Sequence, residues 1–317
     1  MTIRERISIK PALAQFNKVL VIGLGEIGLP VAKYVKGKGF DTYGYDISTI
    51  ALDRAEKTAG IKKADDFGDY DVYILSISTH KVEDMSLPQT DGILTIADRI
   101  SREAEKDGAL VSIESTISKG TSKKVFEILN HRLHVVHAPH RWYASEEKEH
   151  GVNQVRVIGG VCDCCLRIGL QFYGGDNDGR KGGMHPTTPT SYKDLGVAMH
   201  PVSEVEIAEI TKIAENADRY LQIAFAEELY LYCQADNINF PELRDALNTK
   251  WNVGILEPRE GIGGHCLPKD TKMFLQSTSR RKNKILTAAV EVDKDYKKYR
   301  TKLEQQLESP SIEHDSK

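Results

Sequence analysis

A strand-like run that ends in three spaced glycines constrains the fold of this chain more than any other feature. Lys18 to Ile22 (KVLVI) is apolar and leads directly into Gly23-Leu24-Gly25-Glu26-Ile27-Gly28. Apolar residues at helical spacing follow from Leu29 to Val35, and a second strand-like run, Asp41 to Tyr45, ends in Asp46. The glycine pattern is a weak signal alone, but between a strand and a helix it indicates the first βαβ unit of an α/β fold.

The glycine turn is typical of a dinucleotide site. Gly23, Gly25 and Gly28 let the backbone turn tightly and bring N–H groups and a helix N-terminus up to a pyrophosphate. Asp46 lies 18 residues beyond Gly28, close to the spacing of an acid that binds a ribose 2′-hydroxyl and repels a 2′-phosphate. We therefore expect NAD rather than NADP; the alternative is a βα turn with coincidental glycines. The expected cofactor-binding residues are Gly23, Gly25, Glu26, Ile27, Gly28, Asp46, Ser76 and Thr116.

Strand-like and helical segments continue to alternate, as in a doubly wound sheet. The predicted strands are 71–76, 109–114, 134–137 and 155–158, and the predicted helices are 93–105 and 121–129. Ligands bind beyond the carboxyl ends of such strands, which points to Ser115-Thr116 and Pro139-His140-Arg141. A hydroxyl or imidazole there can reach a substrate; the alternatives are a turn-forming hydroxyl and a solvated basic pair.

A long amphipathic helix is predicted in the second half of the chain. Ser203 and Glu206 form a capping box, and apolar residues at helical spacing continue to about Ala235. A helix over 203–235 measures roughly 50 Å, long enough to bridge two domains and pack against a second subunit. Lys212 and Asn216 share one of its faces. Together they can donate hydrogen bonds to an oxygen that becomes negative during a reaction, although such pairs are usually solvent-facing.

The loop GIGGHCLPKD, from Gly261 to Asp270, contains the strongest candidate nucleophile. Its glycines allow a tight turn and the close approach of a ligand. Cys266 follows His265 and precedes Asp270 by four residues. Positive charge and backbone N–H groups favour a thiolate there, and a carboxylate can hold a water. The alternative is a small, buried, apolar cysteine.

Composition excludes several classes of protein. The chain has 317 residues, 40% of them hydrophobic, and a net charge of −3; it is long enough for two domains, and this charge argues against a nucleic-acid or membrane-surface binder. No apolar run approaches the roughly 18 residues that span a bilayer. Five cysteines, an odd number, indicate reduced thiols. We therefore expect a cytoplasmic protein.

Two further segments carry no predicted site. The cluster Cys162-Asp163-Cys164-Cys165 has no second Cys or His group in the sequence to complete four soft ligands. We therefore expect no metal there, and a helix packed against the sheet. The stretch from Gly174 to Pro189, which includes His185, has the composition of a mobile loop or domain boundary.

In order along the chain, these motifs resemble the UDP-glucose/GDP-mannose dehydrogenase family. Its members are NAD-dependent enzymes that oxidise a sugar-nucleotide alcohol to the acid in two hydride transfers. The likeness runs from about Lys18 to Leu275 through GLGEIGLP, STISKGT, AEITKIAEN, NTK (Asn248 to Lys250) and GIGGHCLPKD. His265 is similar to the branch that acts on UDP-N-acetylhexosamines, whereas the UDP-glucose branch has Ser at this place.

The resemblance implies a role for each site residue. Cys266 would hold the aldehyde as a thiohemiacetal and then as a thioester, which water hydrolyses. Lys212 and Asn216 would stabilise the oxyanion. Thr116 would position a water, and Asp270 would support the lysine and the water. The substrate-binding residues implied are Lys212, Asn216, Lys250, Gly263, Gly264 and His265.

Three features differ from the family pattern. His140 stands where the family has a Glu, so a histidine would act as the base in thioester hydrolysis. Arg259 and Glu260 replace a lead-in rich in Pro and Gly. The family continues into a third, nucleotide-binding domain, for which the charged helix expected at about 286–307 leaves too little chain. The nucleotide would then be held by this helix or by a second protein, or the substrate is not an ordinary sugar nucleotide.

The expected organisation is an α/β chain with a helical second domain. We expect a leader (1–17), a Rossmann-type NAD-binding domain (18–195), an all-helical dimerisation domain with the cysteine loop (200–307) and a disordered tail (308–317). The leading hypothesis is an NAD-dependent nucleotide-sugar dehydrogenase that forms a homodimer through helix 203–235. Two others stay open: a single-step hydroxy-acid or alcohol dehydrogenase using Lys212, and a non-catalytic or partner-dependent homologue that binds NAD or a sugar nucleotide.

Overall fold

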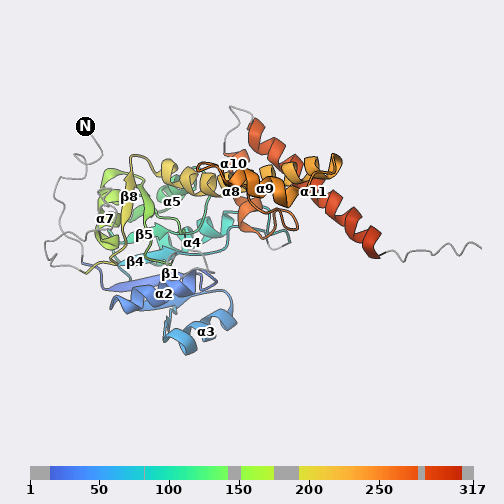
Figure 1. The fold of residues 1–317 in the computed structure, drawn as a ribbon. Helices are drawn as coiled ribbons and strands as arrows, with labels where there is room; N and C mark the ends of the chain where they lie inside the picture. The colour runs from blue at the N-terminus through green and yellow to red at the C-terminus, as the bar shows by residue number, and fades with distance from the viewer. Residues whose placement is uncertain (1–14, 82, 142–150, 175–192, 278–282, 309–317) are drawn as a thin grey trace, which may run out of the picture. The chain divides into compact units, whose positions relative to one another are not determined.

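The computed structural model of the chain describes residues 15–81, 83–141, 151–174, 193–277 and 283–308 (Figure 1). The chain divides into two compact units: Met1–Asp84 with Pro88–Lys212, and Met85–Leu87 with Ile213–Lys317. Most of the predicted leader, nearly all of the 174–189 loop including His185, and all of the predicted tail except Glu308 lie outside the described residues.

The first unit contains an eight-stranded sheet in the order β3-β2-β1-β4-β5-β6-β7-β8. Strands β1 to β6 are parallel neighbours, β7 runs antiparallel to β6, and β8 runs parallel to β7. The strands are β1 (Lys18–Ile22), β2 (Asp41–Tyr45), β3 (Lys62–Lys63), β4 (Val72–Leu75), β5 (Leu110–Ile113), β6 (His134–His137), β7 (Arg156–Gly160) and β8 (Met199–Val202). The carboxyl ends of β1, β4, β5 and β6 therefore share one edge of the sheet.

Helices cover both faces of this sheet because its strands are apolar on both sides. Val19 and Val21 of β1 belong to one buried cluster, and Leu20 and Ile22 to another, as the alternation of strand side chains requires. Helices α2 and α7 pack in the first cluster, and α4 and α5 in the second. The helices of this unit are α2 (Gly28–Gly37), α3 (Thr49–Ala59), α4 (Asp91–Glu103), α5 (Thr121–Ile128) and α7 (Asp163–Tyr173).

The α/β prediction is confirmed, and the predicted strands and helices lie within a few residues of the observed ones. Three elements of the first unit were not predicted: α3, β3 and β8. Helix α3 buries only Ala55 and so has no apolar stripe to recognise. Strand β3 has two residues, and β8 includes Pro201, which reads as the approach to a helix rather than as a strand.

Helix α8 (Val205–Ala235) begins in the first unit and continues into the second. It starts two residues after the predicted cap Ser203. Glu209, near its start, is fully buried and accepts hydrogen bonds from the N–H groups of Gly120 (2.6 Å) and Ser122 (2.8 Å). The beginning of α8 thereby caps the N-terminus of α5, whose orphan N–H groups need acceptors.

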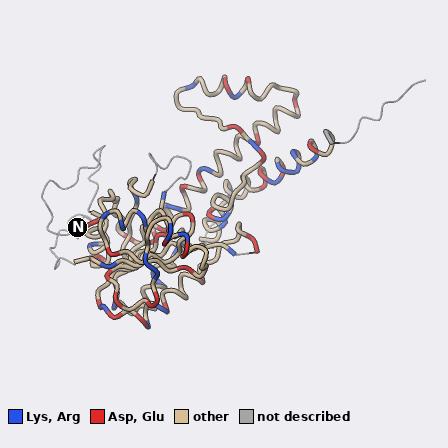
Figure 2. Tube along the Cα trace, turned by 90° about the horizontal axis from the view of Figure 1, so that it is seen from below, with Lys and Arg blue, Asp and Glu red and all other residues tan. Residues whose placement is uncertain are grey.

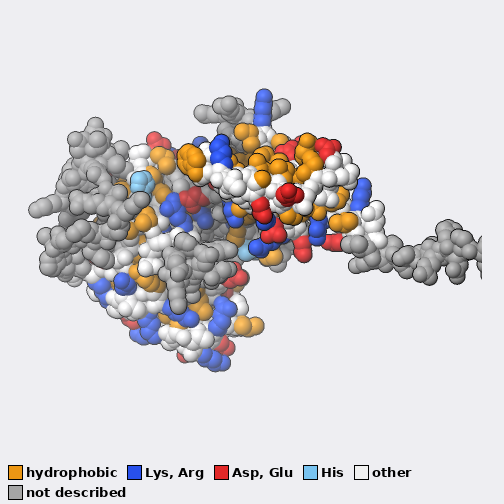
Figure 3. Space-filling view, in the orientation of Figure 1, with side chains coloured by type: hydrophobic (Ala, Val, Ile, Leu, Met, Phe, Trp, Pro, Cys, Tyr) orange, Lys and Arg blue, Asp and Glu red, His pale blue; other side chains and the backbone are white. Residues whose placement is uncertain are grey.

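The second unit is helical. It comprises the rest of α8 with α9 (Phe240–Asn248), α10 (Cys266–Gln276) and α11 (Lys284–Glu308). Its small core includes Tyr220, Ala224, Ile262 and Ala289, from α8, the cysteine loop and α11. Figure 3 shows hydrophobic side chains on the visible face of this unit. The exposed hydrophobic residues of the unit include Phe225, Tyr232 and Trp251.

Charge is mixed along the described chain. Figure 2 shows Lys and Arg residues interspersed with Asp and Glu, in keeping with the low net charge. Among the helices that the structure describes, none contains a stretch both long and apolar enough to cross a bilayer.

Candidate active site

The glycine turn between β1 and α2 has the geometry of a phosphate-binding loop. Gly23 has φ +90°, and a Cβ there would lie 2.4 Å from the carbonyl oxygen of Ser76. A Cβ on Gly28 would lie 1.7 Å from the carbonyl oxygen of Gly23, whereas Gly25 faces open space. The first and third glycines are thus required for the turn and its packing, and the second leaves room for a ligand to approach the backbone.

Two side chains border this turn. Ser76 follows β4, and its buried hydroxyl has no hydrogen-bond partner among the described residues. Asp46 follows β2 and accepts hydrogen bonds from the N–H groups of Leu24 (2.7 Å) and Ser48 (2.8 Å). The open space at Gly25, the orphaned Ser76 hydroxyl and a carboxylate at the end of β2 fit the pyrophosphate and ribose of NAD.

Thr116 lies past the end of β5, as predicted from the sequence. Its carbonyl oxygen accepts a hydrogen bond from the Thr79 hydroxyl (2.7 Å), which fixes the backbone here. The Ser115 hydroxyl instead donates to the carbonyl of Ile77 (2.7 Å). The Ser115 hydroxyl therefore stabilises the turn, which was the alternative to a role in substrate binding. Thr116 stays a candidate for the site.

His140 lies past the end of β6, in a buried polar cluster rather than in a solvated basic pair. It is 4% exposed, and its Nε2 contacts the Glu114 carboxylate. Arg156 Nη1 lies 3.3 Å from the same carboxylate and 3.4 Å from Nδ1 of His140. The Tyr173 hydroxyl donates to the other Glu114 oxygen and lies 2.7 Å from Ser112 Oγ. A carboxylate thus orients the imidazole, as in catalytic pairs of a base and an orienting acid.

The electrostatics of this cluster keep Glu114 ionised and His140 neutral. Burial acts to raise the pKa of Glu114, but Arg156 and His140 outweigh it and hold the pKa at about 2. Burial lowers the pKa of His140; Arg156 and Lys212 add to the decrease, and Glu114 opposes it. A neutral imidazole is the form that accepts a proton.

In the second unit, Cys266 is exposed at the first residue of α10. Its Sγ lies 3.4 Å from Nε2 of His265. Free N–H groups and the helix macrodipole at a helix N-terminus favour a thiolate. Gly263 and Gly264 have open space where a Cβ would be, and Gly264 has φ +71°. The thiol is therefore accessible beside a stretch of bare backbone, unlike a buried structural cysteine.

Asp270 lies one turn into α10 and is 1% exposed. The side-chain amide of Asn216 donates to its Oδ2, and Lys269 Nζ lies 2.7 Å from its Oδ1. Within this unit Asp270 thus forms an ion pair with Lys269. The family resemblance instead implies that Asp270 supports Lys212. The carboxylate fixes the orientation of the Asn216 amide on α8.

Lys212 and Lys250 are the remaining predicted residues. Lys212 is half-buried on α8, four residues before Asn216, and close enough to His140 to affect its pKa. Lys250 is exposed just after α9, where its N–H donates to the carbonyl of Leu247 (3.2 Å).

Sequence reasoning missed Glu114, Arg156, Tyr173 and Lys269. Glu114 and Arg156 are charged residues at the ends of apolar strands, and a charge buried in a sheet requires a partner. That signal was available for these two. Tyr173 and Lys269 gave no such signal, because a Tyr at a helix end and a Lys before an Asp are common in solvated positions.

The prediction of no metal ligands around Cys162, Cys164 and Cys165 depended on the absence of a second Cys or His group, and the fold supplies one. His131 and His134 lie beside the cysteines, and one ligand atom from each of His131, His134, Cys164 and Cys165 lies within 4.8 Å of the others. The prediction of a helix against the sheet is correct, since Cys165 of α7 is fully buried in the core.

Comparisons with known proteins agree with this fold. Residues 206–295 match the UDP-glucose/GDP-mannose dehydrogenase family, central domain. The UDP-N-acetyl-D-mannosamine dehydrogenase of Methanococcus maripaludis is 27% identical over 306 residues, covering 89% of this chain and 66% of that protein. The enzyme of the same name from Campylobacter jejuni is 28% identical, covering 88% and 72%. The chain thus spans about two thirds of the length of these relatives.

Solved structures support the same architecture. The structure of a UDP-D-ManNAc dehydrogenase from Pyrococcus horikoshii superposes with a TM-score of 0.73 at 24% identity, covering 91% of this chain and 71% of that one. At this identity the likeness establishes the fold, a Rossmann-type sheet followed by helices.

Proposed function

We propose that this chain, whose residues 206–295 match the central domain of the UDP-glucose/GDP-mannose dehydrogenase family, oxidises a nucleotide sugar to its uronic acid with NAD. The observation that carries the proposal is the exposed Cys266 at the start of α10, with His265 3.4 Å away. A four-electron oxidation at one carbon needs a group that holds the aldehyde between its two steps, and a thiolate does so.

The first unit would bind the cofactor. NAD held there would supply the hydride acceptor for each of the two oxidations. The N–H groups of the Gly23–Gly28 turn would hold the pyrophosphate, and Asp46 would accept a hydrogen bond from the ribose 2′-hydroxyl. The Ser76 hydroxyl and Thr116 lie past the ends of the next strands along the edge, where a ligand of such a sheet binds.

Cys266 would carry the covalent intermediates. Its thiolate would add to the carbon of the aldehyde formed in the first oxidation, giving a thiohemiacetal; loss of a second hydride would give a thioester. Water would then release the acid and the thiol. Lys212 and Asn216 would donate hydrogen bonds to the oxyanion. Asp270 would act as a positioning residue, because it holds the Asn216 amide.

His140 would accept the proton of the hydrolytic water. Its neutral form is favoured, and Glu114 orients the ring. In the proposed site, His140 takes the role of the family Glu, and Lys250, Gly263, Gly264 and His265 would bind the sugar nucleotide. The UDP-N-acetylhexosamine type of substrate is supported by His265 and by the names of the relatives.

A substrate panel tests this function. Purified protein would be assayed with NAD and UDP-N-acetylmannosamine, UDP-N-acetylglucosamine or UDP-glucose, measuring NADH and the acid formed. We expect about two NADH per acid, and Cys266→Ser is expected to lose net oxidation by at least about 10³-fold while still binding NAD.

The other outcomes separate the remaining hypotheses. One NADH per substrate, unaffected by Cys266→Ser, would establish a single-step dehydrogenase that uses Lys212. NAD binding without turnover of any sugar would favour a non-catalytic or partner-dependent homologue. Full activity of Cys266→Ser would refute the covalent mechanism.

A further inference from the structure

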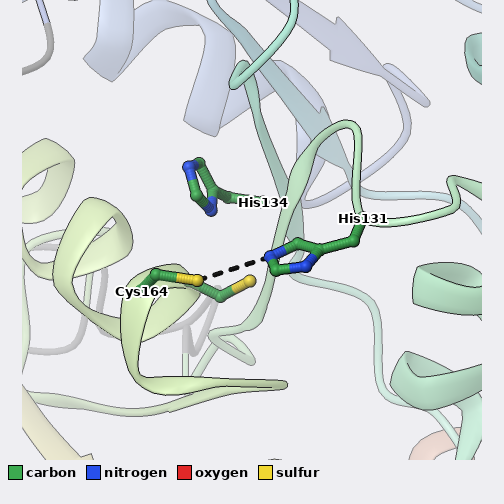
Figure 4. Close-up of side chains that lie close together, drawn as sticks. His131, His134 and Cys164 are labelled. Carbon is green, nitrogen blue, oxygen red and sulfur yellow. Dashed lines mark hydrogen bonds between the residues drawn. The ribbon is translucent and has the colours of Figure 1, made fainter.

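A group of three cysteines and two histidines lies in the first unit, apart from the residues assigned to catalysis. We name His131, His134, Cys162, Cys164 and Cys165 the cysteine–histidine cluster. His131 is in the turn between α5 and β6, and His134 is the first residue of β6. Cys162 caps α7, and Cys164 and Cys165 are in its first turn. Figure 4 shows His131, His134 and Cys164 facing one another.

The distances in the cluster suit tetrahedral coordination. Cys164 Sγ lies 3.4 Å from His131 Nε2, and Cys162 Sγ lies 3.8 Å from the same atom. Ligand atoms around a tetrahedral zinc ion, with Zn–S near 2.3 Å and Zn–N near 2.0 Å, are separated by about 3.3–3.8 Å. One ion can therefore reach these atoms with small side-chain movements.

His134 provides independent support. Its Nδ1 is buried and has no hydrogen-bond partner among the described residues. A buried imidazole nitrogen without a partner is unusual, and a metal ion would satisfy it.

The backbone supports the same interpretation. His131 has φ +54°, directly after Asn130 with φ +49°, so a non-glycine residue is held in the left-handed region, which is costly and often marks a functional position. The N–H of Val135 donates to Cys165 Sγ (3.3 Å), and the N–H of Cys165 donates to Cys162 Sγ (3.4 Å). These hydrogen bonds hold the sulfurs of Cys165 and Cys162 in place.

We propose that His131, His134, Cys164 and Cys165 bind one zinc ion. Two thiolates and two imidazoles are the donor set that Zn²⁺ prefers, and four protein ligands close its coordination shell. A closed site has a structural role rather than a catalytic one. Cys162, with its Sγ 3.2 Å from that of Cys165, lies beside the four proposed ligands and is not one of them.

The place of the cluster on the sheet agrees with a structural role. His134 begins β6, which runs in the same direction as β1, whereas the glycine turn follows the end of β1. The cluster is therefore at the opposite edge of the sheet from the proposed NAD site. A zinc ion there would join the start of α7 to the α5–β6 turn, two segments about 30 residues apart in sequence.

Metal content of the full-length protein tests the proposal. Protein produced with added zinc and purified without chelator is expected to contain about one zinc per chain. Cobalt added to the metal-free protein is expected to give a thiolate-to-cobalt charge-transfer band. Cys164→Ser and His131→Asn, the second chosen because Asn tolerates a left-handed φ, are expected to retain less than about 0.2 zinc per chain. Cys266→Ser is the matched control and should keep the wild-type zinc content.

Two results would overturn the proposal. One is folded wild-type protein that contains no zinc and gives no cobalt–thiolate band. The other is a disulfide between Cys162 and Cys164, whose sulfurs lie 2.6 Å apart. It would be detected as the loss of two hydrogens in the mass of the non-reduced protein, and it would occupy the proposed ligand Cys164. If either variant unfolds, the cobalt titration of the wild type decides. None of these readouts depends on dehydrogenase activity.

Discussion

Glu227 illustrates how one buried side chain affects stability. It is fully buried on α8, and neither carboxylate oxygen has a hydrogen-bond partner among the described residues. Burial raises the pKa of Glu227 to about 8; Asp293 adds to the increase and Lys297 opposes it. Asp293 accepts hydrogen bonds from Tyr220 (3.0 Å) and from the N–H of Ile262 (2.8 Å). Glu227 is therefore uncharged in the folded protein near pH 7.

This leads to a prediction for Glu227→Gln. Because the folded pKa lies above the unfolded one, the stability contribution of Glu227 is complete below about pH 4.5 and decreases as the pH rises to about 8. The amide cannot ionise. Relative to wild type, Glu227→Gln should therefore become more stable by about 2 kcal/mol between pH 5 and pH 8.5, after allowance for solvent screening. Urea unfolding at both pH values measures this.

The exposed neighbour Glu228 provides the control. Glu228→Gln should show no such change with pH. If the free energies of unfolding of Glu227→Gln and wild type differ by the same amount at pH 5 and pH 8.5, the raised pKa assigned to Glu227 is contradicted.

Helix α8 is the element that connects most of the proposed features. It carries Glu209 at the α5 cap, Lys212 and Asn216 four residues apart, and Glu227 in the second unit. Its outer surface also has apolar side chains: Phe225 is 52% exposed and Tyr232 is 56% exposed. Seven residues apart, they lie on one face of the helix. We propose that this face forms the homodimer interface expected for helix 203–235.

Phe225→Asp tests the interface. The proposed interface would bury the ring of Phe225. A carboxylate in its place would lose the apolar contact and bury a charge, so we expect the dimer to be weakened by at least about 100-fold. Light scattering over a micromolar concentration series would measure the dissociation constant. Ile50→Asp makes the same type of change on α3, at a site that is 79% exposed, and should leave the dimer intact. A wild-type monomer at all concentrations would refute the proposal.

For the whole molecule, buried histidines predict sensitivity to acid. His137 is fully buried at the end of β6; its Nδ1–H donates to the carbonyl of Ile113 (2.9 Å), and its Nε2 has no partner among the described residues. Burial lowers the pKa of His137 to about 3, although the Ile113 carbonyl opposes the decrease. The pKa of His140 is lowered too. Both rings must therefore take up a proton when the protein unfolds in acid.

The sign of the pH effect follows from these pKa values. At these two histidines the unfolded chain binds more protons than the folded one below pH 6.5, so their contribution to stability should decrease as the pH falls from about 6.5. Glu227 contributes a change of the opposite sign above about pH 4.5. His137 contributes up to about 1.4 kcal/mol per pH unit between pH 6.5 and its folded pKa of about 3, and His140 acts in the same direction. Glu114, with a folded pKa of about 2, adds to the decrease only below about pH 4.5.

Denaturant unfolding of the wild type and of His137→Asn at pH 7.5, 6 and 5 would check this prediction. The Asn side chain can still donate a hydrogen bond to the Ile113 carbonyl but does not titrate. The free energy of unfolding of His137→Asn should therefore depend less steeply on pH than that of the wild type, by the equivalent of about one proton. Equal slopes for the two proteins would exclude His137 as a source of the acid sensitivity.

Local patterns determined the glycine turn, most strands of the sheet and the helix that carries Lys212 and Asn216. These features depend on neighbours in sequence: a positive φ at Gly23, apolar runs in the strands and helical spacing in α8. The accessible cysteine could be anticipated for the same reason, since the glycines and the start of α10 lie within six residues of it. Helix α3 could not, because its burial depends on one alanine.

Contacts between distant segments were decided only by the tertiary structure. Glu114, His140, Arg156 and Tyr173 come from four segments that meet because the strands of the sheet lie side by side. Asp270 pairs with Asn216 across 54 residues of sequence. His131 and His134 meet the cysteines of α7 because β7 runs antiparallel to β6 and returns the chain to the start of that strand. Sequence periodicity reports which face of an element is buried, but partners for buried charges and free thiols depend on strand order and direction, which no single segment encodes.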